Sequence, residues 1–201
     1  MIVYEVFRDG ANKKIFVPKV DALEYLEHVK GNYSSFRAEE FDCTVEKKAG
    51  RWNPPAIEWF DDDGRKLDKY KDPDITSSPA YTYILGPRAA ELLRPVISDV
   101  AELLPVPFQG ETWYFMNVFN QVDVVDKAKS SYKIYSSGRV GPVEKIVFSP
   151  AKIPHAKLFT RPYSPRLYYA EHYPDDNPNT FKNVVERNKL FGIEIDKVWE
   201  Q

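Results

Sequence analysis

Large apolar side chains occupy most positions of residues 111–119, the strongest hydrophobic pattern in the chain. Successive side chains of a strand point to opposite faces. One face would carry Trp113, Phe115 and Phe119, and the other Tyr114, Met116 and Val118. A strand that is apolar on both faces is usually covered on both sides. We therefore predict a central, covered strand at this position.

Shorter runs rich in β-branched and aromatic residues predict further strands before and after this one. They lie at residues 2–7, 14–17, 57–60, 122–125, 132–135, 143–148, 158–159, 167–170 and 193–199. The first two flank a turn sequence at residues 9–12, so we expect them to pair with each other as a hairpin.

Three segments carry helix signals, at residues 21–30, 87–94 and 178–191. The first begins with the acidic residues of a capping box, Asp21 and Glu24. The second has a proline at its first position, where a missing N–H costs nothing, and we expect Pro95 to end it. The third is closed by a glycine.

An apolar segment at residues 96–104 follows the second helix, and we expect Pro105 and Pro107 to end it. Residues 32–83 are irregular by contrast, with clusters of Gly, Pro and Asp that are typical of turns. A long irregular stretch in a compact domain is usually functional or mobile. The fold class we predict is α+β: one compact domain over residues 1–201, with a mainly antiparallel or mixed sheet and about three helices packed on it.

Composition and charge narrow the classes of partner. The chain has 28 basic and 30 acidic side chains, a formal net charge of −2, and no obvious stripe of Lys and Arg. Binding to a nucleic-acid backbone is therefore not expected. No run approaches the ~20 apolar residues that a membrane helix needs. Residues 1–8 also lack the features of a signal peptide, so we expect a cytoplasmic protein without a membrane partner.

Residues that commonly carry chemistry are sparse. Cys43 is the only cysteine, which excludes an internal disulfide and a zinc site built on cysteines. The histidines are His28, His155 and His172, and no serine lies in a Gly-x-Ser-x-Gly sequence. The sequence also has no metal, calcium or phosphate-binding motif. We therefore expect no enzyme, cofactor or metal site, although catalytic groups can converge from distant positions.

A first candidate site combines aromatic rings with carboxylates. Its members are Trp52, Trp59, Phe60, Asp61, Asp62 and Asp63. Rings anchor protein interfaces and carboxylates attract a basic partner, so this set fits a partner-binding surface. The alternative is a strand packed on the core with a solvated acidic turn beyond it. The three aspartates also offer oxygen ligands of the kind that divalent cations take.

A second candidate is a polar cluster at the end of the apolar strand. Its members are Asn117, Asn120, Asp123 and Asp126. Buried polar groups need hydrogen-bond partners, so this cluster can pin a turn against the core. The alternative is a pocket for a small ligand or a substrate, with His155 as a further member.

Several motifs in the second half occur in an order and spacing that resemble a known family. They are the segment Glu102-Leu103-Leu104-Pro105-Val106, expected to end a helix, then the strand 113–118 running into Val122-Asp123-Val124-Val125-Asp126, and a tail from His155 that ends in Leu190-Phe191-Gly192-Ile193-Glu194-Ile195 and Val198-Trp199. They resemble the Imm11-type immunity-protein family of bacterial polymorphic toxin systems. The resemblance covers residues 85–199, so residues 85–201 are expected to form the family-like core and residues 1–84 a divergent part.

The resemblance implies an antitoxin that binds and neutralises a cognate toxin effector by occlusion, with the toxin encoded next to it. It brings no catalytic residues, because the shared residues look structural. Discrimination between related toxins needs variable contacts. That requirement points to residues 45–75, in the divergent part, as the partner surface. The sequence leaves open whether the chain forms a homodimer.

Overall fold

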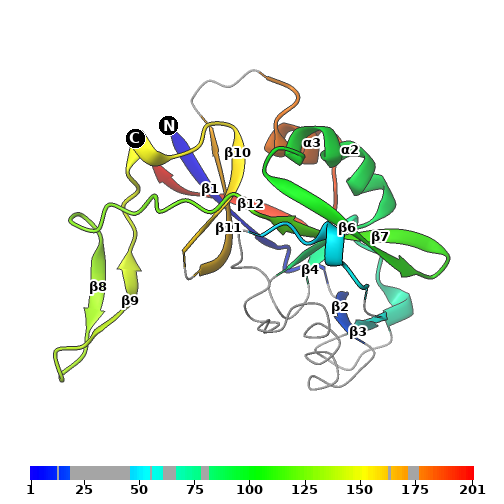
Figure 1. Cartoon of the computed structure of the whole chain (residues 1–201), viewed down its shortest axis with the longest axis horizontal. Coiled ribbons are helices and arrows are strands. Elements are labelled where there is room, and N and C mark those ends of the chain that lie inside the picture. The colour runs from blue at the N-terminus through cyan, green and yellow to red at the C-terminus, as the bar shows by residue number, and fades with distance from the viewer. Residues whose placement is uncertain are drawn as a thin grey trace.

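The computed structural model describes residues 1–12, 14–18, 46–54, 56–60, 67–77, 82–162, 164–171 and 177–201. These residues form two four-stranded sheets, two two-stranded sheets and two α-helices, and all pairings between the named strands are antiparallel (Figure 1). This arrangement agrees with the predicted α+β class. The helix expected at residues 21–30 lies outside the described residues, as do Cys43, Asp61–Asp63 and His172.

The first four-stranded sheet contains both ends of the chain and has the order β10-β11-β1-β12. Its strands are β1 (Ile2–Arg8), β10 (Lys157–Arg161), β11 (Ser164–Glu171) and β12 (Ile193–Glu200). Val3 of β1 lies opposite Ala170 on one side and Trp199 on the other. Figure 1 shows the two termini side by side, and the Met1 amine donates to the Gln201 carbonyl at 2.5 Å.

The expected hairpin between residues 2–7 and 14–17 is wrong. β2 (Ile15–Pro18) pairs instead with β3 (Ile57–Phe60), in a separate two-stranded sheet. β1 buries apolar side chains on both of its faces, so a position inside a sheet suits it. β11 and β12 have eight residues each and can hydrogen-bond along the two edges of β1, whereas β2 has only four residues.

The second four-stranded sheet has the order β4-β5-β7-β6, with β7 (Glu111–Val118) inside it as the apolar pattern predicts. The other strands are β4 (Ile75–Ser77), β5 (Tyr83–Leu85) and β6 (Ala101–Phe108). β6 corrects the sequence analysis, because residues 102–106 belong to a strand and not to the end of a helix. Pro105 and Pro107 are tolerated because β6 is an edge strand, where a missing N–H need not interrupt the pairing.

The two described helices are α2 (Pro87–Ile97) and α3 (Phe181–Arg187). α2 begins at the predicted proline but continues past Pro95, because packing of the buried Leu93 and Ile97 offsets the lost hydrogen bond. Short 3₁₀ turns occur at Ala49–Arg51, Leu67–Lys69 and Pro150–Lys152. The expectation of three α-helices is therefore not confirmed. None of the described helices is long and apolar enough to cross a membrane.

A second two-stranded sheet, formed by β8 (Ser131–Ile134) and β9 (Val140–Lys145), projects from the body of the molecule (Figure 1). We call residues 127–145 the arm. The chain before the arm differs from expectation, since residues 122–125 form no strand. That region carries only isolated bridges, from Gln121 to Thr160 and from Val125 to Phe148.

Three groups of buried apolar residues hold the layers together. The largest lies between the two four-stranded sheets and both helices, and includes Leu93 and Tyr169. A second group, around Trp113, joins the opposite face of β4-β5-β7-β6 to β2 and β3. A third group covers the opposite face of β10-β11-β1-β12 and includes Phe148 and Tyr168. Neighbouring tyrosines of β11 thus belong to different cores, as alternation along a strand requires.

Candidate functional site

Asn117 belongs to a buried polar cluster that ties β7 to residues 46–49. Its Oδ1 accepts from the Lys48 ammonium at 2.9 Å, and its Nδ2 donates to Glu102 Oε1 at 2.7 Å. The Glu102 carboxylate also accepts from the backbone N–H groups of Lys48 and of Ala49. Lys48 is only 1% exposed, so its bond to Asn117 serves a cation that folding has removed from water. The cluster therefore pins an irregular segment onto the sheet.

The other three members of the predicted polar cluster have different partners. Asn120 donates from Nδ2 to the Leu158 carbonyl at 2.8 Å, which holds the chain after β7 against β10. Asp126 accepts from two backbone N–H groups at 3.1 and 3.2 Å and closes a turn at the base of the arm. Asp123 is exposed, 3.6 Å from Lys127 Nζ. The four side chains are therefore not assembled around one pocket.

Two of the three aromatic rings in the first candidate site pack against the core. Trp59 stacks on Phe16 with ring centroids 3.9 Å apart. Trp52 packs against the same apolar group, and its indole N–H donates to the Pro105 carbonyl at 2.6 Å. Phe60 is different, with 45% of its surface exposed. These contacts favour packing as the role of Trp52 and Trp59 and leave Phe60 available to a partner.

The different environments of Trp59 and Phe60 predict different effects on stability. Trp59→Ala is expected to lower the free energy of unfolding by about 2 kcal/mol, because the half-buried ring loses its contact with the core. Phe60→Ala is expected to change it by less than about 0.5 kcal/mol. Urea unfolding followed by circular dichroism measures both. Equal losses in the two variants would contradict this assignment.

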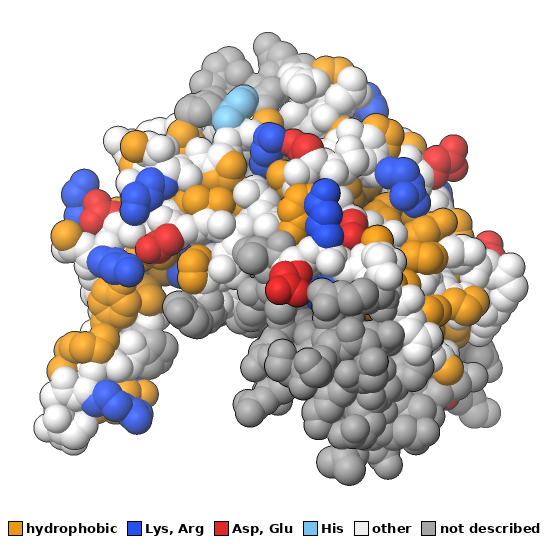
Figure 2. Space-filling view, in the orientation of Figure 1, with side chains coloured by type: hydrophobic (Ala, Val, Ile, Leu, Met, Phe, Trp, Pro, Cys, Tyr) orange, Lys and Arg blue, Asp and Glu red, His pale blue; other side chains and the backbone are white. Residues whose placement is uncertain are grey.

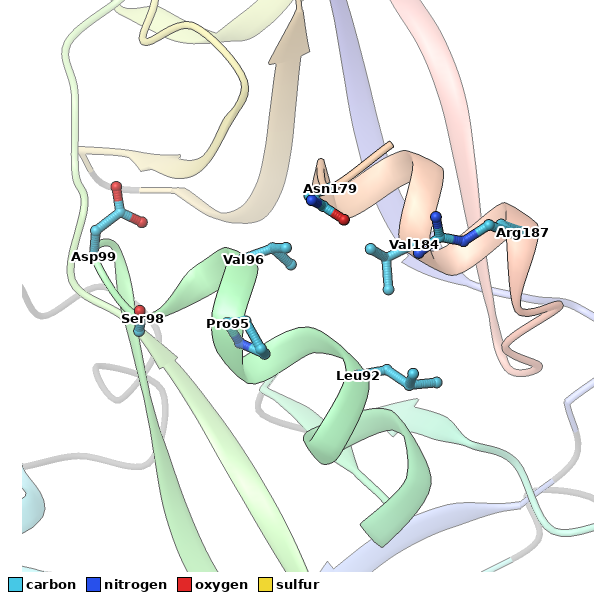
Figure 3. Close-up of a pocket in the computed structure, with 8 residues that line it drawn as sticks. All are labelled: Leu92, Pro95, Val96, Ser98, Asp99, Asn179, Val184 and Arg187. Atoms are coloured by element: carbon cyan, nitrogen blue, oxygen red, sulfur yellow. The ribbon is translucent and has the colours of Figure 1, made fainter. Parts of the chain in front are cut away.

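A hollow of about 520 Å³ lies between α2 and α3 (Figure 3). Its middle is apolar, with Leu92 on α2 facing Val184 on α3. Arg187 and Asp99 stand at opposite ends of it, and Asp99 is already paired with Lys157. No two charged groups converge on one point, so the hollow is a gap between two packed helices.

The arm exposes both apolar and basic side chains. Ile134 and Val140 are 63% and 61% exposed, more than the other large apolar residues that the structure describes as exposed. The arm also carries five Lys or Arg side chains and one Glu. Figure 2 shows apolar surface along the arm and basic side chains toward its end. Large exposed apolar side chains beside cations are typical of an interaction surface.

A groove of about 1210 Å³ lies between the arm and the sheet that contains β1. Its apolar lining includes Val143, Ile146, Phe148, Val198 and Trp199, and its charged lining includes Glu5, Glu144, Lys145, Arg161 and Arg166. Val198 is itself 44% exposed. The groove therefore continues the apolar surface of the arm onto the body of the molecule.

The two arginines of the groove have different partners. Arg166 Nη1 donates to both carboxylate oxygens of Glu5, at 3.0 and 2.9 Å, and this carboxylate raises the pKa of Arg166 while burial opposes it. Arg161 lies over the ring of Tyr168 at 5.2 Å, and its Nη2 donates to Ser164 Oγ at 3.3 Å. Burial raises the pKa of Tyr168, with the Arg161 charge acting against it. The Tyr168 hydroxyl is therefore protonated at neutral pH.

The arm and the groove are not among the sites that the sequence analysis identifies. The net charge of −2 gives no sign of the basic arm, because the basic residues of the arm are balanced by an acidic excess elsewhere in the chain. The signal that could have revealed it is local: Lys and Arg recur through residues 127–145 among β-branched residues and tyrosines. Arg161 and Tyr168 lie on different strands and come together at the site only because those strands pair. A single sequence does not give the register of that pairing.

The described residues contain no group of three or more His, Cys, Asp or Glu side chains that could hold a metal ion. His155 lies in an exposed turn before β10. In comparisons with known proteins, no protein-family model matches the chain and no curated protein matches it.

Proposed function

We propose that this chain is an immunity protein, an antitoxin that binds a cognate bacterial toxin in the cytoplasm and neutralises it by occlusion. The motifs between residues 85 and 199 resemble such proteins in their order and spacing. One of them, residues 102–106, lies on strand β6, so that likeness is one of sequence and not of a helix. The observation that carries the proposal is the arm, because a projecting hairpin with exposed apolar and basic side chains fits a protein partner.

Occlusion requires an element that reaches over or into the partner's active site. The two strands of the arm pair with each other, so the arm is ordered before binding and loses little conformational entropy in a complex. A stable complex of standard size buries about 1,600 Å² in total. We therefore propose the arm and the groove together as the partner surface, in place of residues 45–75. Among the described aromatic rings of residues 45–75, Phe60 is the exposed one.

The alternative function was a ligand-binding protein or enzyme with a pocket near Asn117, Asp123 and Asp126. The side-chain positions give it no support. Asn117 is engaged with Lys48 and Glu102, while Asp126 closes a turn.

Co-expression with the protein encoded next to this chain tests the proposal. We expect the neighbour to be toxic alone, and this chain to restore growth and to co-purify with it. A neighbour that is harmless, or that kills without being bound or suppressed, would overturn the antitoxin proposal.

The same assay separates the two candidate surfaces. The double variant Ile134→Asp, Val140→Asp is expected to weaken the complex at least about 100-fold, since it places charges where an interface would be apolar. Phe60→Asp, a matched change at an exposed ring outside the arm, is expected to keep rescue intact. If Phe60→Asp abolished rescue and the double variant did not, residues 45–75 would be the partner surface.

A further inference from the structure

We infer that the groove beside the arm binds an extended, acidic protein segment, with one carboxylate held by Arg161 and Tyr168. The inference rests on the proposed function, in that the segment would belong to the toxin. It adds the chemistry of the partner: an acidic strand or loop that carries apolar side chains between its carboxylates.

Unsatisfied donors in the groove carry the inference. Tyr168 is 1% exposed, and its buried hydroxyl donates to no acceptor among the residues described. The buried Nε of Arg161 likewise has no hydrogen-bond partner among the residues described. Both residues line the groove. Buried donors without acceptors are costly, and a carboxylate supplies two acceptor oxygens that a guanidinium and a phenol can share.

The charge balance of the groove favours an anion there. The Arg166 guanidinium is already compensated by Glu5 at 2.9 Å. The Arg161 guanidinium donates instead to the neutral Ser164 hydroxyl and lies over an aromatic ring. Farther along the groove, Lys145 and the basic residues of the arm add positive potential. An acidic segment would therefore meet one partly buried cation and several exposed ones.

The shape of the lining favours an extended occupant. Residues 143–148 line the groove without a gap, although alternate side chains of an extended chain point in opposite directions. The main chain itself therefore forms part of the wall. β9 pairs with β8 on one side, so the described structure leaves its other edge open to a further strand. Peptides are often bound in this way, with backbone bonds at an edge and pockets for alternate side chains.

A nucleic acid is the competing occupant for a basic arm with tyrosines. The apolar part of the groove argues against it, because Phe148 and Trp199 interact with the aromatic cluster of the sheet and Val198 is aliphatic. Glu5 also lines the groove but is paired with Arg166, which leaves Glu144 as a lining carboxylate that a chain of evenly spaced phosphates could not avoid. A protein segment that alternates acidic and apolar residues can place a carboxylate at Arg161 and apolar side chains along the rest of the lining.

Tyr168→Phe is the decisive variant, because it removes one hydroxyl that donates no hydrogen bond within the described structure. Stability is therefore expected to stay unchanged, while affinity for an acidic occupant falls about tenfold, as expected for a lost hydrogen bond to a charged group. Arg161→Gln is expected to weaken binding at least as much. Tyr114→Phe makes the same change on β7, outside the groove, and serves as the matched control.

Two probes are used with the full chain: the neighbouring toxin, and a fluorescent peptide of about eight residues that alternates Glu and Val. A Lys-Val peptide and an oligothymidylate are the comparison probes. We expect the Glu-Val peptide alone among the small probes to bind, and Tyr168→Phe and Arg161→Gln to weaken both it and the toxin. Tighter binding of the oligothymidylate, or affinities that neither variant changes, would overturn the inference.

The failures of the two proposals are distinguishable. A toxin that is bound and suppressed equally well by Tyr168→Phe and Arg161→Gln would leave the antitoxin proposal standing and remove this inference. A Glu-Val peptide that binds through Tyr168 and Arg161, beside a neighbour that is not bound, would remove the antitoxin proposal and keep the acidic-segment groove.

Discussion

Gly192→Ala is expected to lower the free energy of unfolding by about 4 kcal/mol. Gly192 has a φ of +120°, a backbone conformation that side chains strongly disfavour. A methyl group on it would lie 1.8 Å from the Ile75 carbonyl oxygen and 2.8 Å from Pro73 Cβ. Both neighbours are parts of the chain that cannot swing aside as a flexible side chain does.

The surrounding hydrogen bonds explain why the backbone cannot move to make room. The Phe191 carbonyl accepts from the N–H groups of Asp74 and Ile75, at 2.8 and 3.0 Å. The Asp74 carboxylate in turn accepts from the Phe191 N–H at 2.9 Å. These bonds join the start of β12 to the start of β4, and so connect the two four-stranded sheets. A shift at Gly192 therefore disturbs the seam between the sheets.

Thermal unfolding is the measurement, and for a chain of this size the midpoint is expected to fall by about 10 °C. Gly10→Ala is the control, since a methyl group on Gly10 would have no atom within 4 Å and the residue has no positive φ. Its effect is expected to stay below about 0.5 kcal/mol. If the two variants were equally stable, the close contact at Gly192 would not be the constraint that we describe.

The second large effect is expected at the buried polar cluster. Glu102→Ala is expected to lower the free energy of unfolding by about 3 kcal/mol, because several donors lose one shared acceptor in a part-buried site. These donors are the backbone N–H groups of Lys48 and Ala49 and the amide of Asn117. In the alanine variant the Lys48 side chain, which is 1% exposed, would lie beside the space that the Glu102 carboxylate had filled.

Urea unfolding measures this effect, with two comparison variants. Glu102→Gln keeps one acceptor oxygen and is expected to lose about half as much stability. Glu91→Ala, at an exposed position of α2, is expected to lose less than about 0.5 kcal/mol. A loss at Glu102 no greater than that at Glu91 would show that residues 46–49 are held by other contacts.

Local patterns predicted several elements of the fold but not their partners. The central position of β7 followed from its two apolar faces, and the start of α2 followed from Pro87. The pairing of β1 was mispredicted because a turn next to it suggested a hairpin. The strand through Pro105 was missed because the rule against proline in strands is relaxed at an edge, and edges are properties of the assembled sheet.

The candidate site was harder to predict for the same reason. The rings of Trp52 and Trp59 have the composition of an interface, and only the tertiary contacts with Phe16 and Pro105 show that they are packed. The unsatisfied donors of Arg161 and Tyr168 have no signature in sequence at all. They can be recognised only once neighbouring strands have been placed and acceptors sought.

The central place of β1 in its sheet has a consequence for how the protein is made. Tyr4 donates to Glu171, 167 residues later in the chain, and β12 follows later still. By contrast, the sheet β4-β5-β7-β6 and α2 come from one continuous stretch and can assemble early on the ribosome. Strand β1 therefore remains unpaired until β11 has emerged. Until then the cell must keep an apolar strand, which also contains Glu5 and Arg8, from aggregating.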